Sequence, residues 1–323
     1  MLHPETDFPD LYVNDGQLDP QSTGLLEATC PRTTPMAEMR HRLERDGYLY
    51  LKGLLPRADV LEARRKYFEL LAPTGILDPR TSPIEGIFDR SQDATDFPGF
   101  GTGRPGTGTT TSNTFMTLAL RAHAEDWYRN DLCKHPALIA FVEEFTGWGK
   151  STWALERTIL RNNLPGNPAT GVHYDYIFLR HGEDSVLTAW VPVGDIALNG
   201  GGLIYLENGH VLGKATERHF TGKAKAAGLS EEEAKTAFNR HMMSSGMLSQ
   251  DPKHFGKEHQ HRWLVSAYEA GDVVFHDSYM IHASTLNHDE NGVIRLGTDL
   301  RFADARGDWD TVRPALLFDP VLP

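Results

Sequence analysis

The segment Thr170-Gly171-Val172-His173-Tyr174-Asp175-Tyr176 decides how the rest of the sequence is interpreted. If this segment is a β-strand, side chains two residues apart point to the same face of the sheet. His173 and Asp175 would then present an imidazole and a carboxylate side by side. A second histidine from a neighbouring strand would complete a 2-His-1-carboxylate set, which leaves open positions on iron(II). The segment therefore predicts a metal site carried by a β-sheet.

The second half of the chain has the pattern of an all-β domain. From Thr152 onward, short β-rich segments alternate with clusters of Gly, Asn and Asp. Strands are predicted at residues 153–160, 172–179, 186–193, 203–206, 263–267, 272–276, 280–284 and 293–302. So many short strands fit a sandwich or a jelly roll.

The first half of the chain is predicted to be largely helical. Helices are expected at residues 36–45, 58–71, 118–132 and 136–145, with a strand at 48–51. The helix at 58–71 has one apolar face, and Pro73 ends it. A later helix is expected at residues 234–243, after an acidic first turn.

We predict one folded domain over residues 35–323, preceded by an N-terminal arm at residues 1–34 that lies over its surface. Residues 73–113 have no period and many Gly, Pro, Thr and Asp residues, which predicts a flexible lid. Within this loop, residues 101–106 match GxGxxG, but no strand precedes them and no helix follows, as a dinucleotide site requires. A helical insertion at residues 213–262 is expected to cover one end of the β domain.

The composition limits the partners of the chain. Among 323 residues, 32 are Lys or Arg and 44 are Asp or Glu, so the formal charge is −12, which argues against nucleic acid or an anionic membrane as a partner. Cys30 and Cys133 alone cannot form a disulfide framework or a thiolate metal cluster. No apolar run approaches the roughly 20 residues of a membrane span, and neither a signal peptide nor a peroxisomal C-terminus is recognised. We expect a soluble cytoplasmic protein with a small-molecule substrate, and a homodimer if the arm wraps a neighbouring subunit.

The metal prediction has alternatives within the sequence. The chain has 15 histidines, and a histidine hydrogen-bonded to a carboxylate on a sheet surface would also give His-x-Asp. His276 and His282 are six residues apart, so both can face inward, and spacing does not decide between them. Three histidines within residues 254–261 are interpreted as part of a solvated connector, and His210 as a histidine that caps a turn. Arg295, in the last strand, could pair with a carboxylate of a cosubstrate.

Several short motifs occur in an order that is typical of one family. They are residues 47–55, Phe145-Thr146-Gly147, His173-Tyr174-Asp175, Ala189-Trp190, residues 199–203 with Asn208-Gly209-His210, and His282-Ala283-Ser284 followed by Asn287 and Arg295. From about residue 47 to residue 302, the chain resembles the phytanoyl-CoA dioxygenase family of iron(II)/2-oxoglutarate oxygenases, and most of all its fungal members that modify natural products. The resemblance implies a double-stranded β-helix, a cupin-like jelly roll, with flanking helices.

The resemblance also implies a function and a site. The family uses Fe(II), 2-oxoglutarate and O2 and releases succinate and CO2. Its metal ligands correspond to His173, Asp175 and His282. Its 2-oxoglutarate contacts correspond to Arg295, which would anchor the C5-carboxylate, and to Ser284, Trp190, Ile159 and Thr170. The carboxylate of Asp175, where related halogenases have Gly or Ala, favours hydroxylation, desaturation or a related oxidation of a small, largely apolar metabolite in secondary-metabolite biosynthesis.

The chain departs from the family pattern in two places. The segment between His282 and Arg295 is longer than in the best-known member, and a lysine that helps to bind 2-oxoglutarate has no clear counterpart, for which Arg121 and Asn113 are candidates. Two other functions therefore stay open. A cupin-type isomerase or hydrolase would use the metal without 2-oxoglutarate, and Arg295 would then bind another anion. A non-catalytic binding protein would have kept a decayed site.

Overall fold

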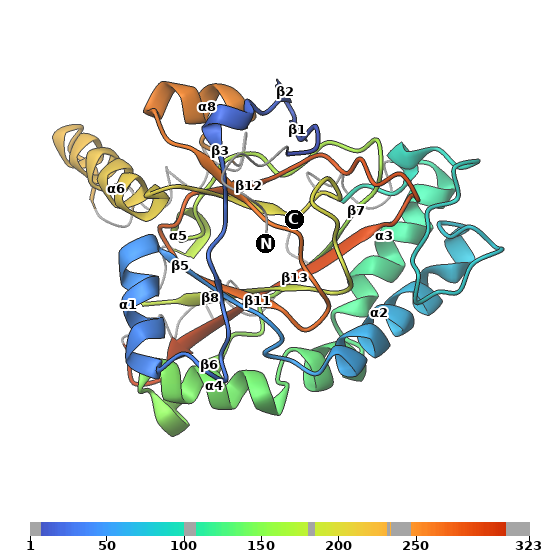
Figure 1. Ribbon diagram of the computed structural model, residues 1–323, viewed down its shortest axis with the longest axis horizontal. Coiled ribbons are helices and arrows are strands. Elements are labelled where there is room, and N and C mark those ends of the chain that lie inside the picture. Colours follow the sequence, from blue (N-terminus) through green and yellow to red (C-terminus); the bar gives the residue numbers. More distant parts are fainter. Residues whose placement is uncertain (1–7, 100–107, 180–184, 231–232, 234–246, 308–323) are drawn as a thin grey trace.

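Two facing β-sheets form the centre of the molecule, and helices cover the outer face of the larger sheet (Figure 1). The computed structural model describes residues 8–99, 108–179, 185–230, 233 and 247–307. The larger sheet runs β4 (Ala28–Thr29), β5 (Tyr48–Leu51), β11 (Val273–Asp277), β8 (Leu187–Pro192), β13 (Arg295–Asp304) and β6 (Thr152–Ala154), and β7 (Ile159–Asn163) also pairs with β13. The smaller sheet runs β12 (His282–Ser284), β9 (Leu203–Leu206), β10 (Trp263–Val265) and β3 (Thr23–Leu25). The predicted jelly roll with flanking helices is confirmed.

Alternate residues of the larger sheet belong to different cores, because successive side chains of a strand point to opposite faces. The outer rows, with Phe275 of β11 and Phe302 of β13, pack in the same core as the helices. The inner rows, with Trp190 of β8 and Val274 of β11, meet Tyr205 of the smaller sheet. The helices of the first half are α1 (Met36–Asp46), α2 (Arg57–Leu71), α3 (Thr110–Ala122) and α4 (Pro136–Thr146).

Local signals explain why most helices begin and end where the sequence predicts. α1 ends at Gly47 and α4 ends at Gly147, and both glycines have the left-handed backbone (φ 75°) that closes a helix. α4 begins with Pro136, whose missing N–H costs nothing in the first turn. The helix predicted at 118–132 begins earlier than expected and is interrupted after Ala122. α3 begins at Thr110, because the side chain of Thr109 accepts a hydrogen bond from the Ser112 amide, and a separate π-helical turn follows at Trp127–Leu132.

Three other elements differ from the prediction. The strand expected at 153–160 is two strands, β6 and β7, because residues 155–158 lie opposite only residues 300–301 of β13 and the chain bulges out of the ladder there. α6 (Gly209–Ala226) falls largely within the helical insertion predicted at residues 213–262, but no separate helix was located there, since its glycines weaken the helical pattern. α8 (Pro252–His259) carries two of the three histidines of the predicted connector. The predicted helix at 234–243 and the GxGxxG motif at 101–106 lie outside the described residues.

The N-terminal segment takes part in both sheets. β3 pairs in parallel with β10 of the smaller sheet, and β4 pairs in parallel with β5 of the larger sheet. Leu11, Val13 and Leu18, which precede β3, are buried. The described part of the arm therefore extends an edge of each sheet as well as covering the surface.

The described part of the predicted lid is packed against the domain. Arg64 of α2, itself buried, donates hydrogen bonds to four carbonyl oxygens. Two of them, at Ile84 and Glu85, belong to this loop, and the other two, at Val193 and Ile294, belong to the ends of strand segments (2.9–3.0 Å). A single guanidinium therefore joins the loop to the larger sheet.

Replacing Arg64 by alanine is expected to lower the free energy of unfolding by roughly 3 kcal/mol, because buried carbonyl oxygens would lose their donors. Arg65→Ala is the matched control, since the side chain of the neighbouring Arg65 is half-exposed and pairs with Glu62 and Glu69 on the surface of α2. Chemical unfolding followed by circular dichroism measures both variants. Equal shifts of the two midpoints would contradict the anchoring role of Arg64.

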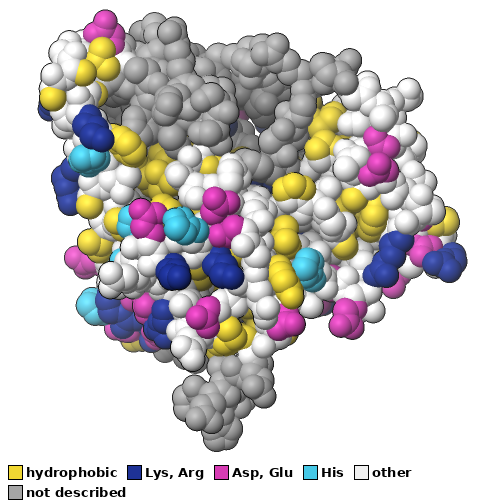
Figure 2. Space-filling model, turned by 90° about the horizontal axis from the view of Figure 1, so that it is seen from above, with side chains coloured by type: hydrophobic (Ala, Val, Ile, Leu, Met, Phe, Trp, Pro, Cys, Tyr) yellow, Lys and Arg dark blue, Asp and Glu magenta, His cyan; other side chains and the backbone are white. Residues whose placement is uncertain are grey.

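The surface is of mixed charge on the face seen in Figure 2. Among the residues drawn in colour there, acidic and basic side chains are interspersed. None of the described helices combines the length and the apolar character that a bilayer crossing requires.

Candidate metal centre

Two side chains from one short segment and a third from much later in the sequence meet between the two sheets. Ligand atoms of His173, Asp175 and His282 all lie within 4.8 Å of one another, and all three residues are buried. The two histidines are joined through the backbone, because each amide donates to the carbonyl of the other (3.0 and 2.9 Å). Their rings are 4.2 Å apart between centroids. The segment of His173 thus extends the smaller sheet beyond β12.

Both imidazoles are oriented by hydrogen bonds from the nitrogen that faces away from the site. Nδ1 of His173 lies 2.9 Å from the carbonyl oxygen of Gly171, and Nδ1 of His282 lies 2.9 Å from that of Met280. A carbonyl oxygen only accepts, so Nδ1 carries the proton in each ring and Nε2 keeps its lone pair. This second contact is typical of metal-binding histidines, which makes both rings suited to a metal ion.

Asp175 reaches the site from a turn and not from a strand. The strand predicted at 172–179 was wrong beyond His173, because the Asp175 carbonyl accepts from the Phe178 amide (2.9 Å) and the short helix α5 (Tyr176–Leu179) follows. Oδ2 of Asp175 accepts a hydrogen bond from the Thr188 hydroxyl (2.6 Å), while Oδ1 lies 4.0 Å from Nε2 of His282. One carboxylate oxygen is therefore fixed by the protein, and the other faces the histidines.

The electrostatics of the site suit a cation. Burial lowers the pKa of His173 to about 3 and also lowers the pKa of His282, so both imidazoles are neutral near pH 7. Burial opposes ionisation of Asp175, but the Arg301 guanidinium and His276 outweigh it and hold the pKa of that carboxyl well below its usual range. Two neutral nitrogen donors and one carboxylate on one side of a point form the donor set of non-haem iron(II) oxygenases.

His276, the rival of His282, lies behind the carboxylate. Its Nε2 is 3.4 Å from Oδ2 of Asp175, the oxygen that Thr188 already holds, and its Nδ1 is 3.2 Å from the Tyr205 hydroxyl. Among the described residues, His276 is not one of those whose ligand atoms lie close enough together to hold a metal ion. Geometry therefore places His276 as a support of Asp175. Of the other histidines considered, His254 lies on the exposed side of α8 and His210 is buried in α6.

Arg295 and Trp190 lie on the inner face of the larger sheet. The Arg295 side chain is buried, and its Nε donates to the Gly201 carbonyl (2.9 Å). Its guanidinium carbon is 5.9 Å from the centre of the Trp190 ring. Burial, and then the neighbouring Arg161, lower the pKa of Arg295 to about 10, so it stays charged at neutral pH.

The three remaining predicted cosubstrate residues border the same interior. The Ser284 hydroxyl accepts from the Thr170 amide (2.9 Å), and the Ser284 amide donates to the Thr170 carbonyl (3.1 Å). Ile159 of β7 lies opposite Asp299 of β13, which in turn lies opposite Trp190 of β8. Arg121 does not belong here, because it pairs with Glu125 on the exposed side of α3.

Sequence reasoning missed several polar residues that surround the triad. Thr188 and Arg301 contact Asp175, and Arg161 donates to the Thr170 hydroxyl (3.1 Å). Strand parity could have found them, because Thr188 is two residues before Trp190 and Arg301 is six residues after Arg295.

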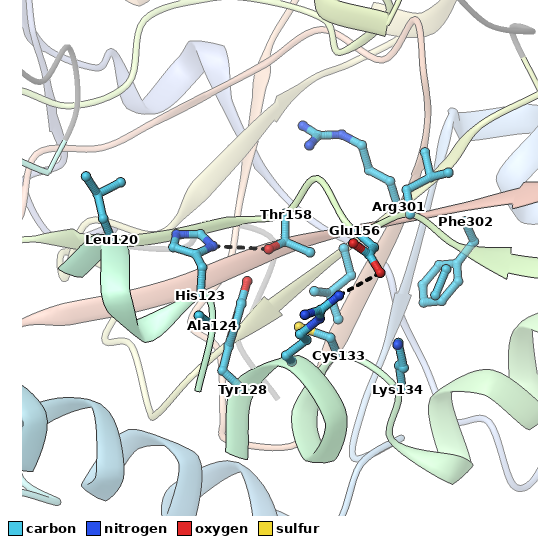
Figure 3. A pocket seen from close by; sticks show the side chains of 14 residues that line it. Leu120, His123, Ala124, Tyr128, Cys133, Lys134, Glu156, Thr158, Arg301 and Phe302 are labelled. Atoms are coloured by element: carbon cyan, nitrogen blue, oxygen red, sulfur yellow. Dashed lines mark hydrogen bonds and ion pairs between the residues drawn. The ribbon is translucent and has the colours of Figure 1, made fainter. Parts of the chain in front are cut away.

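A cavity of about 270 Å³ lies on the helix-covered side of the larger sheet (Figure 3). Its lining includes His123, Tyr128, Thr158 and Phe302. Arg301 borders this cavity, but its guanidinium points away from the other labelled side chains (Figure 3) and approaches Asp175 (3.7 Å). The sheet therefore separates this cavity from the candidate metal centre.

Comparison with known proteins agrees with the geometry. A family model described as "Phytanoyl-CoA dioxygenase (PhyH)" matches residues 43–295. The curated relative 1-deoxypentalenic acid 11-beta-hydroxylase from Streptomyces exfoliatus is 23% identical over 287 residues, covering 84% of this chain and 84% of the relative. The sequence predicted a particular likeness to fungal members of the family. This relative is from Streptomyces, so that likeness stays a prediction.

Two solved structures share the fold. One is the epimerase SnoN in complex with Fe3+, α-ketoglutarate and nogalamycin RO, with 18% identity, a TM-score of 0.52, and coverage of 89% of this chain and 92% of that chain. The other is the α-ketoglutarate-dependent carbocyclase SnoK from nogalamycin biosynthesis, with 15% identity, a TM-score of 0.50, and coverage of 87% and 88%. Because the family model spans most of the sequence and the histidine–carboxylate set is in place, the chain belongs to the phytanoyl-CoA dioxygenase (PhyH) family and is an oxidoreductase that uses Fe(II), 2-oxoglutarate and O2.

Proposed function

We propose that His173, Asp175 and His282 hold the Fe(II) of this enzyme. The observation that carries the proposal is the convergence of their ligand atoms within 4.8 Å, with both Nδ1 atoms hydrogen-bonded to carbonyl oxygens on the far side. A set of three ligands leaves the remaining positions of the metal open for cosubstrate and O2.

Arg295 is proposed to bind the C5-carboxylate of 2-oxoglutarate. Its burial supports this role, since a guanidinium in a dry site forms strong charge-assisted bonds with a carboxylate. Trp190 would pack beside the cosubstrate, and Ser284, Thr170 and Ile159 would complete its contacts. Each of these residues lies on, or next to, a row of side chains that points into the space between the two sheets.

The protein's contribution to the reaction is position and exclusion of water. Bound Fe(II) with 2-oxoglutarate and O2 supplies the oxidising chemistry, and succinate and CO2 are the coproducts. Thr188 and His276 hold one oxygen of Asp175, so the other oxygen keeps a fixed direction. Tyr205 lies against both His276 and His282, and together with Trp190 it closes the inner end of the site to solvent.

The substrate is proposed to be a small, largely apolar metabolite of secondary metabolism that undergoes hydroxylation, desaturation or a related oxidation. The named hydroxylase among the relatives favours hydroxylation of such a compound. The test is anaerobic reconstitution with Fe(II) and 2-oxoglutarate, followed by exposure to O2 with a metabolite panel and measurement of succinate. Samples without Fe(II) are the control. Product formed without any consumption of 2-oxoglutarate would instead support a cupin-type isomerase or hydrolase.

Thr188→Val is expected to weaken Fe(II) binding roughly 10- to 100-fold, because it removes the hydrogen bond that fixes Asp175. Thr298→Val is the matched control. Its hydroxyl pairs with Tyr128 (2.8 Å) on the opposite face of the same sheet. Anaerobic titration with Fe(II) measures both dissociation constants, and equal values for the two variants would show that Thr188 does not act through the metal ligand.

A further inference from the structure

The cavity on the helix-covered side of the larger sheet has the properties of a separate binding site (Figure 3). Its volume is about 270 Å³, whereas protein interiors are close-packed and have few voids larger than a water molecule. Among the described residues that line it, none is His173, Asp175 or His282. The cavity therefore offers space for a small molecule away from the metal ligands.

Both walls of the cavity are formed by irregular segments. On the helical side, the π-helical turn Trp127–Leu132 carries Tyr128, whose carbonyl accepts a hydrogen bond from the Cys133 amide (2.9 Å). On the sheet side, residues 155–158 bulge out of the ladder, because they lie opposite only residues 300–301 of β13. Turns and bulges of these two kinds are frequent beside functional sites. Two local departures from regular structure thus create the cavity.

The cavity has an apolar, buried end and a charged opening. Tyr128, Leu300 and Phe302 line it and are buried. The rings of Tyr128 and Phe302 favour an aromatic ligand, because aromatic pairs are stabilised beyond the area that they bury. Arg129 and Glu156 are exposed and form an ion pair (2.8 Å), which places the opening beside them. A ligand that enters here would cover apolar surface and leave these two charges in water.

Two polar side chains in the lining can contact a ligand. Nδ1 of His123 is 3.2 Å from the hydroxyl oxygen of Thr158 (Figure 3), and both residues are half-buried. The second ring nitrogen of His123, Nε2, has no hydrogen-bond partner among the described residues. One polar group of a ligand could therefore pair with His123 or Thr158.

The interior of the cavity is uncharged at neutral pH. Burial lowers the pKa of His123 to about 4 and raises the pKa of Cys133 to about 12. Burial also raises the pKa of the Tyr128 hydroxyl. A neutral imidazole has one nitrogen that donates and one that accepts, and a hydroxyl group can pair with either. The lining thus favours an uncharged ligand with a hydroxyl group over an ionised ligand.

We propose that this cavity binds a small uncharged aromatic molecule with one hydroxyl group. Its hydroxyl contacts His123 and Thr158, and its ring packs against Tyr128 and Phe302. Since a cavity of about 150 Å³ holds benzene, the volume of about 270 Å³ suits roughly ten non-hydrogen atoms. The site is separate from the candidate metal centre, and the proposal does not depend on the proposed function.

Fluorine NMR of the anaerobic Fe(II)–2-oxoglutarate protein tests the proposal with two probes of matched shape. One probe is 4-(trifluoromethyl)phenol, and the other is 4-(trifluoromethyl)toluene, in which a methyl group replaces the hydroxyl. The phenol is expected to bind roughly 3- to 10-fold more tightly, because the apolar probe covers polar groups of the cavity without pairing with them. If the phenol shows no saturable binding, or binds no more tightly than the toluene, the proposal is overturned.

The same titration of the metal-free protein separates this site from the metal centre. The two dissociation constants should be unchanged, because no metal ligand lines the cavity. A preference for the phenol that appears only when Fe(II) is bound would place the probe at the metal centre and would overturn the proposal.

Two variants assign the preference to residues. His123→Phe keeps a ring and Thr158→Val keeps the side-chain shape, and each should reduce the preference to less than about twofold, because a pairing atom is lost. His254→Phe, on the exposed side of α8, is the matched control and should behave as the parent protein. Circular dichroism shows whether each variant is folded, and Thr158→Val decides alone if His123→Phe is not. A full preference in every folded member of the pair contradicts the proposal.

Ala124→Trp tests the location of the site. Ala124 lines the cavity and is exposed, so an indole ring there would fill the opening and leave the buried core unchanged. Both probes should bind about tenfold or more weakly, while the thermal unfolding midpoint stays close to that of the parent. Unchanged binding of both probes would show that they bind elsewhere, and the proposal would fail.

Discussion

His282→Ala and His173→Ala are each expected to abolish Fe(II) binding and turnover. Each substitution removes one of three metal ligands. The resulting loss of Fe(II) affinity must exceed the roughly 10- to 100-fold loss that follows when a residue that only supports a ligand is changed. Anaerobic Fe(II) titration and succinate release measure the two effects separately. His254→Ala is the control, because His254 is exposed on α8 and only approaches Glu258 (3.9 Å).

The same experiment decides between the two histidines that spacing left open. His276→Ala should lower Fe(II) affinity without abolishing it, since the oxygen of Asp175 that His276 contacts is also held by Thr188. If His276→Ala lost the metal while His282→Ala retained it, the assigned triad would be wrong.

Arg295→Ala is expected to raise the apparent KM for 2-oxoglutarate roughly 10- to 150-fold. The variant deletes a charge-assisted anchor of about 1.5–3 kcal/mol, and each 1.4 kcal/mol corresponds to a factor of ten. Fe(II) affinity should change little, because Arg295 is not among the residues that contact the triad carboxylate. Succinate formation at varied 2-oxoglutarate concentration gives the measurement.

Arg262→Ala is a suitable control for Arg295→Ala. Arg262 pairs with Glu207 (2.6 Å) on the surface, and its side chain is half-exposed. Arg295→Lys should fall between the parent and the alanine variant, since lysine keeps the charge and loses the planar fork. An unchanged requirement for 2-oxoglutarate in Arg295→Ala would refute the assignment of Arg295 to the cosubstrate.

The predictions of secondary structure were correct where the local sequence pattern and the tertiary structure favour the same element. The strand at Tyr48–Leu51 and the helix α4 match their predictions, because apolar periodicity and glycine or proline boundaries coincide there. The start of α3 was missed because its first turn is rich in threonine, a residue type that also suits loops. The hydrogen bond that the Thr109 side chain accepts from the Ser112 amide favours the helix.

The three predicted ligands lie together in the structure, but strand alternation does not explain why His173 and Asp175 do so. His173 and Asp175 do point to one place, but the chain turns after His173, so strand alternation is not the cause. The backbone bonds between His173 and His282 and the hydroxyl of Thr188 set the geometry instead. The two histidines are more than 100 positions apart, and the contact of the hydroxyl depends on how the strands are paired. Neither contact can be recognised in a single sequence unless the strand pairing is known.

The alternation of the two faces of β13 has an evolutionary consequence. Residues that pack against the helices and residues that face the candidate site alternate along the same ten-residue strand. A lineage can therefore change every second position, and with it the compounds that the barrel accepts, while the helices on the other side keep the same partners. Selection for a new reaction and selection for stability can therefore act on neighbouring positions of the strand with little conflict.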